Sequence, residues 1–315
     1  MTGRRSPPAA RRRLIPSARP GTAPGEPRWV GLLYAAPALA LFAVFGIWPF
    51  IQTVLISFTR WKGIGAQVPV GLDNYAEVLR DEDLYMGFAR AGILILFYAI
   101  IPLCIGLLLA ALLSRVRIRG VGTYRVLLFL PQVIAAVVIA IAWRWIYSAD
   151  GIANETLRLI GLGDLARSWL GDFDLALPAI GLVGTWLNAG LAMIFFVAGV
   201  QKIPLDLYDA ARVDGAGPWA EFRAVTLPGL RNEIVVVLTI TVIFALRNFD
   251  LIWVTTRGGP GDATTTPSVL LYELGFESRR LGTASAIAVL LTVLILLVTI
   301  VIVRLGERGD PETST

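Results

Sequence analysis

The sequence predicts an all-α, polytopic membrane protein with six transmembrane helices. Hydrophobic residues make up 56% of the 315 residues, charged residues only 16%, and the mean hydropathy is +0.70. A soluble domain carries about 25% charged residues, so this chain is short of solvating side chains. Helices are the expected form of each span, because backbone polar groups inside lipid must be satisfied within their own segment.

Six uncharged runs predict the positions of the spans. They cover residues 30–59, 91–114, 126–143, 175–201, 234–246 and 281–303. Most runs reach the roughly 20 residues that a helix needs to cross a bilayer core of about 30 Å. The third run reaches Tyr147 only by including Arg144. The fifth reaches Thr255 only by including Arg247 and Asp250. The first run is far longer than a signal-peptide core of about 7–15 residues, so we interpret it as a retained span.

Basic residues predict which side of the membrane each connection faces. Arginines are concentrated in residues 1–28 and after the second and fourth runs, whereas the connections after the first and third runs are richer in acids. The positive-inside rule therefore places both termini and residues 203–230 in the cytoplasm, in a multi-pass protein of the cytoplasmic membrane. Arg279 and Arg280 on the outer side are an exception. The net charge of +5 follows from this bias and requires no nucleic-acid partner.

The chain is expected to form one membrane domain with two tails. Residues 1–28 are rich in Pro, Ala and Arg without an apolar period, which predicts a disordered basic cytoplasmic tail. Residues 29–305 form the six-helix transmembrane domain, and residues 306–315 form a cytoplasmic C-terminal tail. Turn and helix signals also predict short helices in the outer connections at 60–87, 148–174 and 255–280.

The residue types exclude several kinds of chemistry. Histidine is absent and Cys104 is the sole cysteine, so the chain has no histidine metal site and no intramolecular disulfide. The sequence contains no phosphate-cradling G-x-x-x-x-G-K-S/T motif and no G-x-S-x-G motif. We therefore expect no catalytic residue and no metal or cofactor bound by this chain. Any ATP that it uses must be bound by another subunit.

Residues 203–230 form an unusually elaborate connection between the fourth and fifth runs. Pro204 fits the first turn of a helix, and Gly215 ends that helix. A second helix begins at Gly217-Pro218 and stops at Leu227-Pro228. The predicted structure is therefore helix, glycine turn, helix, with aromatic side chains that are exposed unless something covers them. Two interpretations remain open: a helical hairpin lying on lipid headgroups, or a segment that docks into a groove of another protein.

At these residues the sequence resembles the EAA coupling loop of ATP-binding-cassette (ABC) importer permeases. The family pattern is E-A-A, three residues, G, nine residues, I-x-L-P; here Asp209 replaces the usual glutamate and Val225 the usual isoleucine. The stretches IPLDLYDAARVDGA, GGPGDATTT and FLPQVIAAVVIAIAWRWIY resemble the carbohydrate branch, the maltose/glycerol-phosphate permease family, and the resemblance extends over residues 32–305. The ATPase-coupling residues that it implies are Tyr208, Asp209, Ala210, Ala211, Asp214, Gly215, Ala216, Phe222, Leu227 and Pro228.

The resemblance implies a type I ABC importer transmembrane domain that works by alternating access. It also implies partners: ABC ATPase subunits that use ATP and Mg, a second permease subunit that is expected to be non-identical, an extracytoplasmic solute-binding protein and a sugar substrate, with membrane lipid around the spans. Closure of the ATPase pair on ATP would move the coupling loop as a rigid body and switch the spans between inward- and outward-facing states.

Few polar residues lie inside the predicted spans. Amide and carboxylate groups can bind sugar hydroxyls, and aromatic rings can pack on the apolar face of a sugar ring. The candidate substrate-binding residues that supply these groups are Asn188, Asn248, Asp250 and Trp253. Structural roles remain open for the polar residues. Asn188 could form a hydrogen bond between helices, Arg247 and Asp250 could pair at i, i+3, and Arg144 between two tryptophans could anchor a helix at the membrane interface.

Three other functions compete with carbohydrate import. An importer permease for another small solute, such as a polyamine or a phosphate ester, would share the coupling loop. An ion-coupled secondary transporter would need acids near the membrane midplane, and the second, fourth and sixth runs contain none. A membrane enzyme would need a nucleophile–base pair or a metal site that the sequence lacks.

Overall fold

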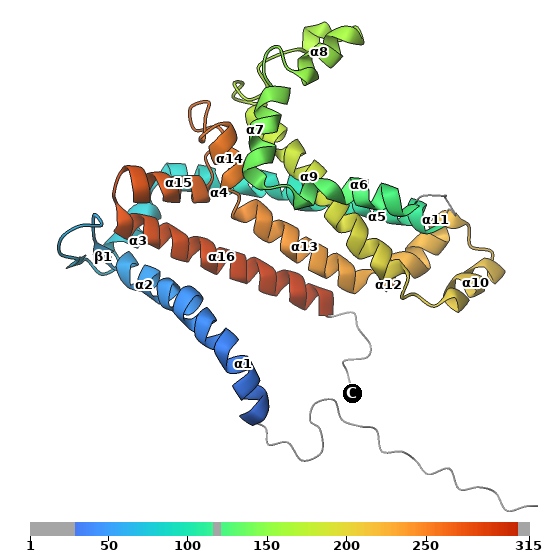
Figure 1. Cartoon of the computed structure of the whole chain (residues 1–315), viewed down its shortest axis with the longest axis horizontal. Coiled ribbons are helices and arrows are strands. Elements are labelled where there is room, and N and C mark those ends of the chain that lie inside the picture. Colours follow the sequence, from blue (N-terminus) through green and yellow to red (C-terminus); the bar gives the residue numbers. More distant parts are fainter. Residues whose placement is uncertain (1–28, 116–120, 308–315) are drawn as a thin grey trace, which may run out of the picture. The chain divides into compact units, whose positions relative to one another are not determined.

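The computed structural model describes residues 29–115 and 121–307, which are almost entirely helical (Figure 1). The predicted tail at 1–28 lies outside the described residues. So does the predicted tail at 306–315, except for its first two residues, which end the last helix.

The first of two compact units, residues 1–51, contains one helical run with little burial. α1 (Trp29–Phe42) continues through the π-helical segment η1 (Ala43–Ile47) into α2 (Trp48–Ser57), whose last residues belong to the second unit. The stretch Leu33–Ser57 is 25 residues long and apolar enough to cross a membrane. No side chain of residues 33–51 is buried. These apolar side chains are suited to contact with lipid, as the prediction of a retained first span requires.

The second unit, residues 52–315, contains the remaining described elements. In chain order they are β1 (Thr59–Arg60), β2 (Val68–Pro69), α3 (Asp73–Val78), α4 (Glu82–Ile95), η2 (Leu96–Ile100), α5 (Ile101–Arg115), α6 (Val121–Val133), α7 (Ala136–Ile146), α8 (Ile152–Leu159), η3 (Gly163–Leu165), α9 (Ala176–Val200), α10 (Leu205–Val213), α11 (Pro218–Glu221), η4 (Phe222–Thr226), α12 (Leu227–Gly229), α13 (Arg231–Leu246), α14 (Asp250–Thr255), α15 (Pro267–Tyr272), η5 (Glu273–Glu277) and α16 (Leu281–Glu307). The segments η2, η4 and η5 are π-helical, and η3 is a 3-10 turn.

Within the described residues, four helices are long and apolar enough to cross a membrane singly. They are Leu33–Ser57, Glu82–Leu112, Ala176–Val200 and Leu281–Glu307. Two further spans are obtained if each of two bent helix pairs is one span. The pairs are Gly122–Val133 with Ala136–Ile146, and Pro218–Gly229 with Arg231–Leu246. The predicted all-α, six-span class is confirmed in this sense, but the third candidate span is bent, and the fifth includes residues 218–229 of the predicted cytoplasmic connection.

The third predicted span is two helices rather than one. α6 and α7 meet at an angle of 97°. Pro131 lies in the last turn of α6, where it removes a backbone donor, and Ala135 before α7 has an extended backbone with ψ 135°. The sequence predicts the third span as one helix, because hydropathy does not register the change of direction, whereas the structure divides it into two.

The fifth predicted span is interrupted at residues 247–249, between α13 and α14, so its expected continuation as one helix to Thr255 is wrong. Long-range hydrogen bonds hold the interruption. Asn248 Nδ2 donates to the Tyr98 hydroxyl at 2.8 Å, and Thr266 Oγ1 donates to the Asn248 carbonyl at 3.2 Å. Because the Thr266 hydroxyl already satisfies the Asn248 carbonyl, this carbonyl does not need a backbone amide of the same helix as its partner.

The same interruption removes the expected pairing of Arg247 with Asp250. The i, i+3 geometry needs an unbroken helix, and these residues flank a non-helical turn. No ion pair joins them among the side chains that the structure describes.

α9 is the central helix of the second unit and packs against α5, α6 and α13 (Figure 1). Small residues let the backbones approach closely. A Cβ atom on Gly106 of α5 would lie 2.6 Å from the Cβ of Ala192, and a Cβ on Gly190 would overlap the Leu128 carbonyl oxygen of α6. Close van der Waals packing of this kind drives helix association where lipid provides no hydrophobic force.

The short helices expected in the three outer connections are confirmed as α3, α8 and α15. One feature departs from the all-α prediction in the described part of the chain: an antiparallel ladder that pairs Thr59 with Pro69 and Arg60 with Val68. Two residues per strand are too few to leave an alternating pattern in the sequence. Asn74 of α3 supports the ladder by donating to the Thr59 carbonyl at 2.9 Å.

Candidate functional site

The segment 203–230 begins as the sequence predicts. α10 ends at Val213, and Gly215 has φ 81°, in the left-handed region that favours glycine. The Ala216 amide donates to the Ala211 carbonyl at 2.9 Å, and the Asp214 amide donates to the Ala210 carbonyl at 3.0 Å. These bonds satisfy carbonyls that the end of a helix leaves open. The predicted helix and glycine turn are confirmed.

The sequence predicts that the second helix stops at Leu227-Pro228, but the structure shows the helix continuing past these residues. Beginning at Pro218, α11 passes through the π-helical η4 into α12, and the chain changes direction only around Leu230. The Leu227 amide bonds to the Phe222 carbonyl, five residues back. Pro228 then stands in the first turn of α12, where its missing N–H costs nothing. The π-helical turn therefore lets the helix accommodate a proline.

Two side-chain bonds close the two helices onto each other, and a third lies within α10. The Tyr208 and Thr226 hydroxyls are hydrogen-bonded at 3.2 Å, and both residues are buried. Arg212 donates from Nε to Glu221 Oε2 at 3.3 Å and from Nη1 to Asp209 Oδ1 at 3.1 Å. Glu221 is also buried. We call residues 203–230 with these bonds the coupling hairpin, after the role that the resemblance implies.

The predicted coupling residues fall into an outward and an inward group. The exposed ones are Asp209, Ala210, Asp214, Gly215, Leu227 and Pro228. Large apolar side chains surround them on α10, where Leu205 is 75% exposed and Val213 is 87% exposed. Tyr208 points inward instead, and Ala211, Ala216 and Phe222 are half-buried. Most exposed coupling residues therefore lie on the α10 side of the turn, with Leu227 and Pro228 on α12, whereas Tyr208 holds the hairpin together.

The base of the coupling hairpin is tied to the long helices. Lys202, after α9, forms an ion pair of 2.9 Å with Glu233 of α13. Arg231 of α13 donates to the Leu305 carbonyl of α16 at 3.1 Å. Sequence reasoning missed these ties and also the roles of Glu221 and Thr226. Their partners are too far along the chain to show as a local pattern.

Removing Arg212 is expected to loosen the hairpin. Arg212→Ala takes a charged donor from a buried carboxylate, a loss of about 1–2 kcal/mol. The measurement is hydrogen–deuterium exchange of the amides of 205–221, which should exchange about tenfold faster. Asp209→Ala is the control, because its carboxylate is 70% exposed and surface pairs contribute little. Equal effects of the two variants would contradict a structural role for the Arg212–Glu221 pair.

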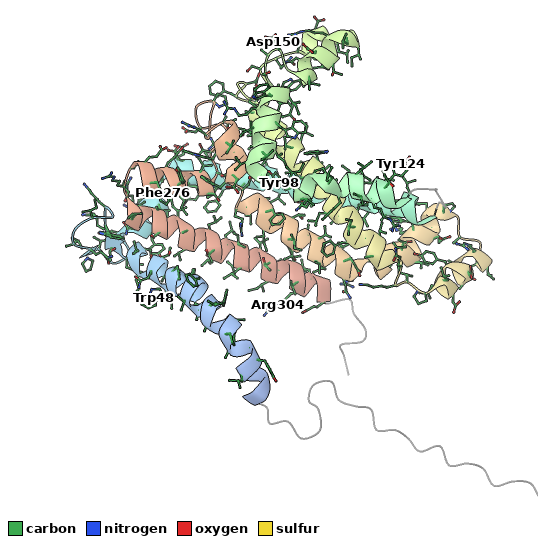
Figure 2. The ribbon with its side chains drawn as sticks, in the orientation of Figure 1. Trp48, Tyr98, Tyr124, Asp150, Phe276 and Arg304 are labelled. Atoms are coloured by element: carbon green, nitrogen blue, oxygen red, sulfur yellow. The ribbon has the colours of Figure 1, made fainter. Side chains whose placement is uncertain are left out.

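The candidate substrate residues lie where α9, α13 and the α4–η2–α5 helix meet. Asn188 is buried and donates to the Gly184 carbonyl of its own helix at 2.8 Å. The Tyr98 ring packs so closely on Gly184 that a Cβ atom there would overlap it, and the Tyr98 hydroxyl accepts from Asn248. Figure 2 shows Tyr98 among these helices. Tyr98 therefore contacts both regions: its ring packs on Gly184, whose carbonyl binds Asn188, and its hydroxyl binds Asn248.

The other two candidates are more accessible. Asp250 is exposed at the start of α14, and Trp253 is half-buried in the same helix. Arg144 of α7 donates to the Val254 carbonyl at 3.2 Å, so this arginine ties α7 to α14. Its neighbour Trp145 is 78% exposed. Within the described residues, no group of three or more Cys, Asp or Glu side chains could hold a metal ion.

A helical chain with up to six candidate spans and a tied interhelical hairpin has the architecture of a transport permease. Residues 102–309 match the family "Binding-protein-dependent transport system inner membrane component", and the chain belongs to this family. A probable ABC transporter permease protein of Pyrococcus horikoshii is 31% identical over 284 residues, 89% of this chain and 96% of that protein. The trehalose/maltose transport system permease protein MalF of Thermococcus litoralis is 34% identical over 281 residues, 88% of this chain and 94% of that protein.

A solved structure shares the fold. The crystal structure of a bacterial alginate ABC transporter, in complex with an alginate pentasaccharide-bound periplasmic protein, contains a chain with a TM-score of 0.75 and 24% identity. The match covers 90% of this chain and 98% of that chain. As a member of the matched family, the chain is a permease subunit of a binding-protein-dependent ABC importer and a multi-pass inner membrane protein. It is not itself the ATP-hydrolysing subunit.

Proposed function

We propose that this permease subunit moves a sugar into the cell by alternating access, with ATP hydrolysed on partner ATPase subunits. The observation that carries the coupling role is the closed hairpin at 203–230. It exposes the Asp209–Gly215 side of one helix and is tied at its base to α9 and α13. A rigid element of this kind can convert movement of a partner into movement of the spans.

Two observations support the proposal that the substrate is a sugar. One is the similarity to the trehalose/maltose permease of Thermococcus litoralis. The other is the set of amide, carboxylate and aromatic groups at Asn188, Asn248, Asp250 and Trp253, which suits sugar hydroxyls and ring faces. Asn188 and Asn248 are buried in this conformation. They would reach a sugar only when the Tyr98 helix separates from α9 and α13, as alternating access requires.

The proposal includes the membrane orientation and the assembly. Both termini and the coupling hairpin lie in the cytoplasm, as the distribution of arginine and lysine favours. The partners are two ABC ATPase subunits, a second, non-identical permease subunit and an extracytoplasmic solute-binding protein. Copurification of a tagged chain with these subunits tests the assembly. Recovery of two identical copies of this chain would replace the heteromeric arrangement with a homomeric one.

The transport assay uses proteoliposomes that contain the complete importer, its solute-binding protein and enclosed ATP. Labelled trehalose, maltose, lactose, putrescine and glycerol phosphate are supplied separately. We expect ATP-dependent accumulation of a sugar and none of the last two compounds. Accumulation of putrescine or glycerol phosphate alone would assign another solute class. Accumulation without ATP and without the ATPase subunits would instead indicate an ion-coupled transporter.

A further inference from the structure

Four aromatic rings from two segments form a continuous row beside the candidate substrate residues. Phe249, directly before α14, and Trp253 of α14 stack at 5.7 Å between ring centroids, with planes only 17° apart. On α15 and η5, Tyr272 and Phe276 stack at 5.0 Å with planes 27° apart. Tyr272 joins the two pairs, because its centroid lies 5.0 Å from Phe249 and 4.5 Å from Trp253. We call these four rings the aromatic row.

The aromatic row leads from the surface to the polar candidates. None of its members is buried, and Phe276 at the outer end is 69% exposed (Figure 2). At the inner end, Phe249 stands between Asn248 and Asp250 in the sequence. Rings that served only to fill a core would be buried. Phe249 and Trp253 pack partly against the core that contains Leu251 and Ile252, but no member of the row is fully buried.

Charged and acidic groups border the row. The Arg257 guanidinium lies 5.9 Å from the Trp253 ring centroid. Glu273 follows Tyr272 directly, and burial, together with the carboxylates of Glu277 and Asp262, raises the pKa of its carboxyl. A guanidinium and a carboxyl therefore adjoin the row, and both groups can bind sugar hydroxyls.

The connection between the two halves of the row is firmly held. Thr256 and Thr264 hydroxyls are hydrogen-bonded at 2.8 Å, and Thr264 Oγ1 donates to the Gly259 carbonyl at 2.9 Å. From the neighbouring helix, Arg90 donates to the Thr265 carbonyl at 3.3 Å. These bonds fix the 256–266 turn, so the ring positions are set before any ligand arrives.

We infer that the aromatic row is a stacking track, along which a sugar passes between the outer surface near Phe276 and the polar residues around Asn248. The inference rests on the proposed sugar-import function and goes beyond it by assigning Phe249, Tyr272 and Phe276 to the path. Sugar rings have apolar faces that pack on aromatic rings. The centroids of successive rings lie 4.5 to 5.7 Å apart, so a sugar that leaves one ring is within reach of the next, while the bordering polar groups bind the hydroxyls.

Phe276 provides the test, because its exposure makes a folding defect on substitution unexpected. The complete importer is reconstituted with sugar-loaded binding protein, and sugar uptake and ATP hydrolysis are measured together at saturating sugar. Phe276→Ala should lower the sugar moved per ATP hydrolysed by about three- to tenfold, the range expected for losing one aromatic contact. Stimulation of ATP hydrolysis by the binding protein should stay unchanged, which separates the track from the coupling hairpin.

Three further variants make the test specific. Phe276→Trp should retain transport, and Phe276→Leu should fail like alanine, because leucine is apolar but has no ring. Phe173→Ala is the matched control, since Phe173 is also 69% exposed but lies outside the row, and it should transport normally. Wild-type transport by Phe276→Ala, or full rescue by Phe276→Leu, overturns the track while leaving sugar import intact. A wild-type importer that moves no sugar overturns both proposals.

Discussion

Replacing Gly215 by valine is expected to abolish sugar uptake while the protein still inserts into the membrane at its normal level. Gly215 has φ 81°, a conformation that costs a β-branched residue about 1–3 kcal/mol. No heavy atom lies within 4 Å of a Cβ built at this position, so crowding is not the cause. Valine would relieve the strain by changing how the chain leaves α10, which displaces the exposed face that carries Asp209 and Ala210.

The measurement is uptake of labelled sugar together with ATP hydrolysis in proteoliposomes. Gly217→Val is the matched control: its Cβ would also meet open space, but Gly217 has φ −71° and ψ 170°, which valine adopts without strain. Gly215→Asn should keep part of the uptake, because asparagine tolerates the left-handed region. Equal uptake by Gly215→Val and Gly217→Val would rule out the turn as a coupling element.

The coupling hairpin could be predicted because its signals are local. Pro204 before a helix, Gly215 after it and Pro218 at the start of the next helix each act through the backbone of neighbouring residues. The same local reasoning wrongly predicted a helix end at Pro228, because the preceding π-helical turn lets the helix continue with the proline in place. Local rules assume the ordinary i to i−4 ladder, and they lose force where that ladder widens.

The candidate substrate site could be predicted only by residue type. Amides at 188 and 248 stand out in an apolar chain, but their partners follow from the fold. The Asn248 bond to Tyr98 crosses 150 positions in the sequence and helps to break the fifth span. In the aromatic row, the spacing of Phe249 and Trp253 is visible in the sequence, as is that of Tyr272 and Phe276. Contact between the pairs depends on how α14 and α15 pack.

The second large effect is expected at Gly190, where even one added methyl group should destabilise the assembled protein. A Cβ on Gly190 of α9 would overlap the Leu128 carbonyl oxygen and lie 3.1 Å from the Phe129 Cα. Both obstacles are backbone atoms of α6, so no change of rotamer relieves the overlap, and the helices must separate. Overpacking of this kind costs about 1–3 kcal/mol. Gly190→Ala should therefore lower both the thermal midpoint of the purified importer and its amount in the membrane.

Gly92→Ala is the matched control and should raise the thermal midpoint or leave it unchanged. Gly92 lies inside α4 and is exposed, and a Cβ there meets no heavy atom within 4 Å. Alanine is favoured over glycine in a helix interior by about 0.8–1.0 kcal/mol, so this variant should be at least as stable as the wild type. The pair separates the general effect of adding a methyl group from the contact between α9 and α6. If Gly190→Ala melted at or above the wild-type temperature, close approach of these two helices would not be what holds the domain together, and the small residues along α9 would need another explanation.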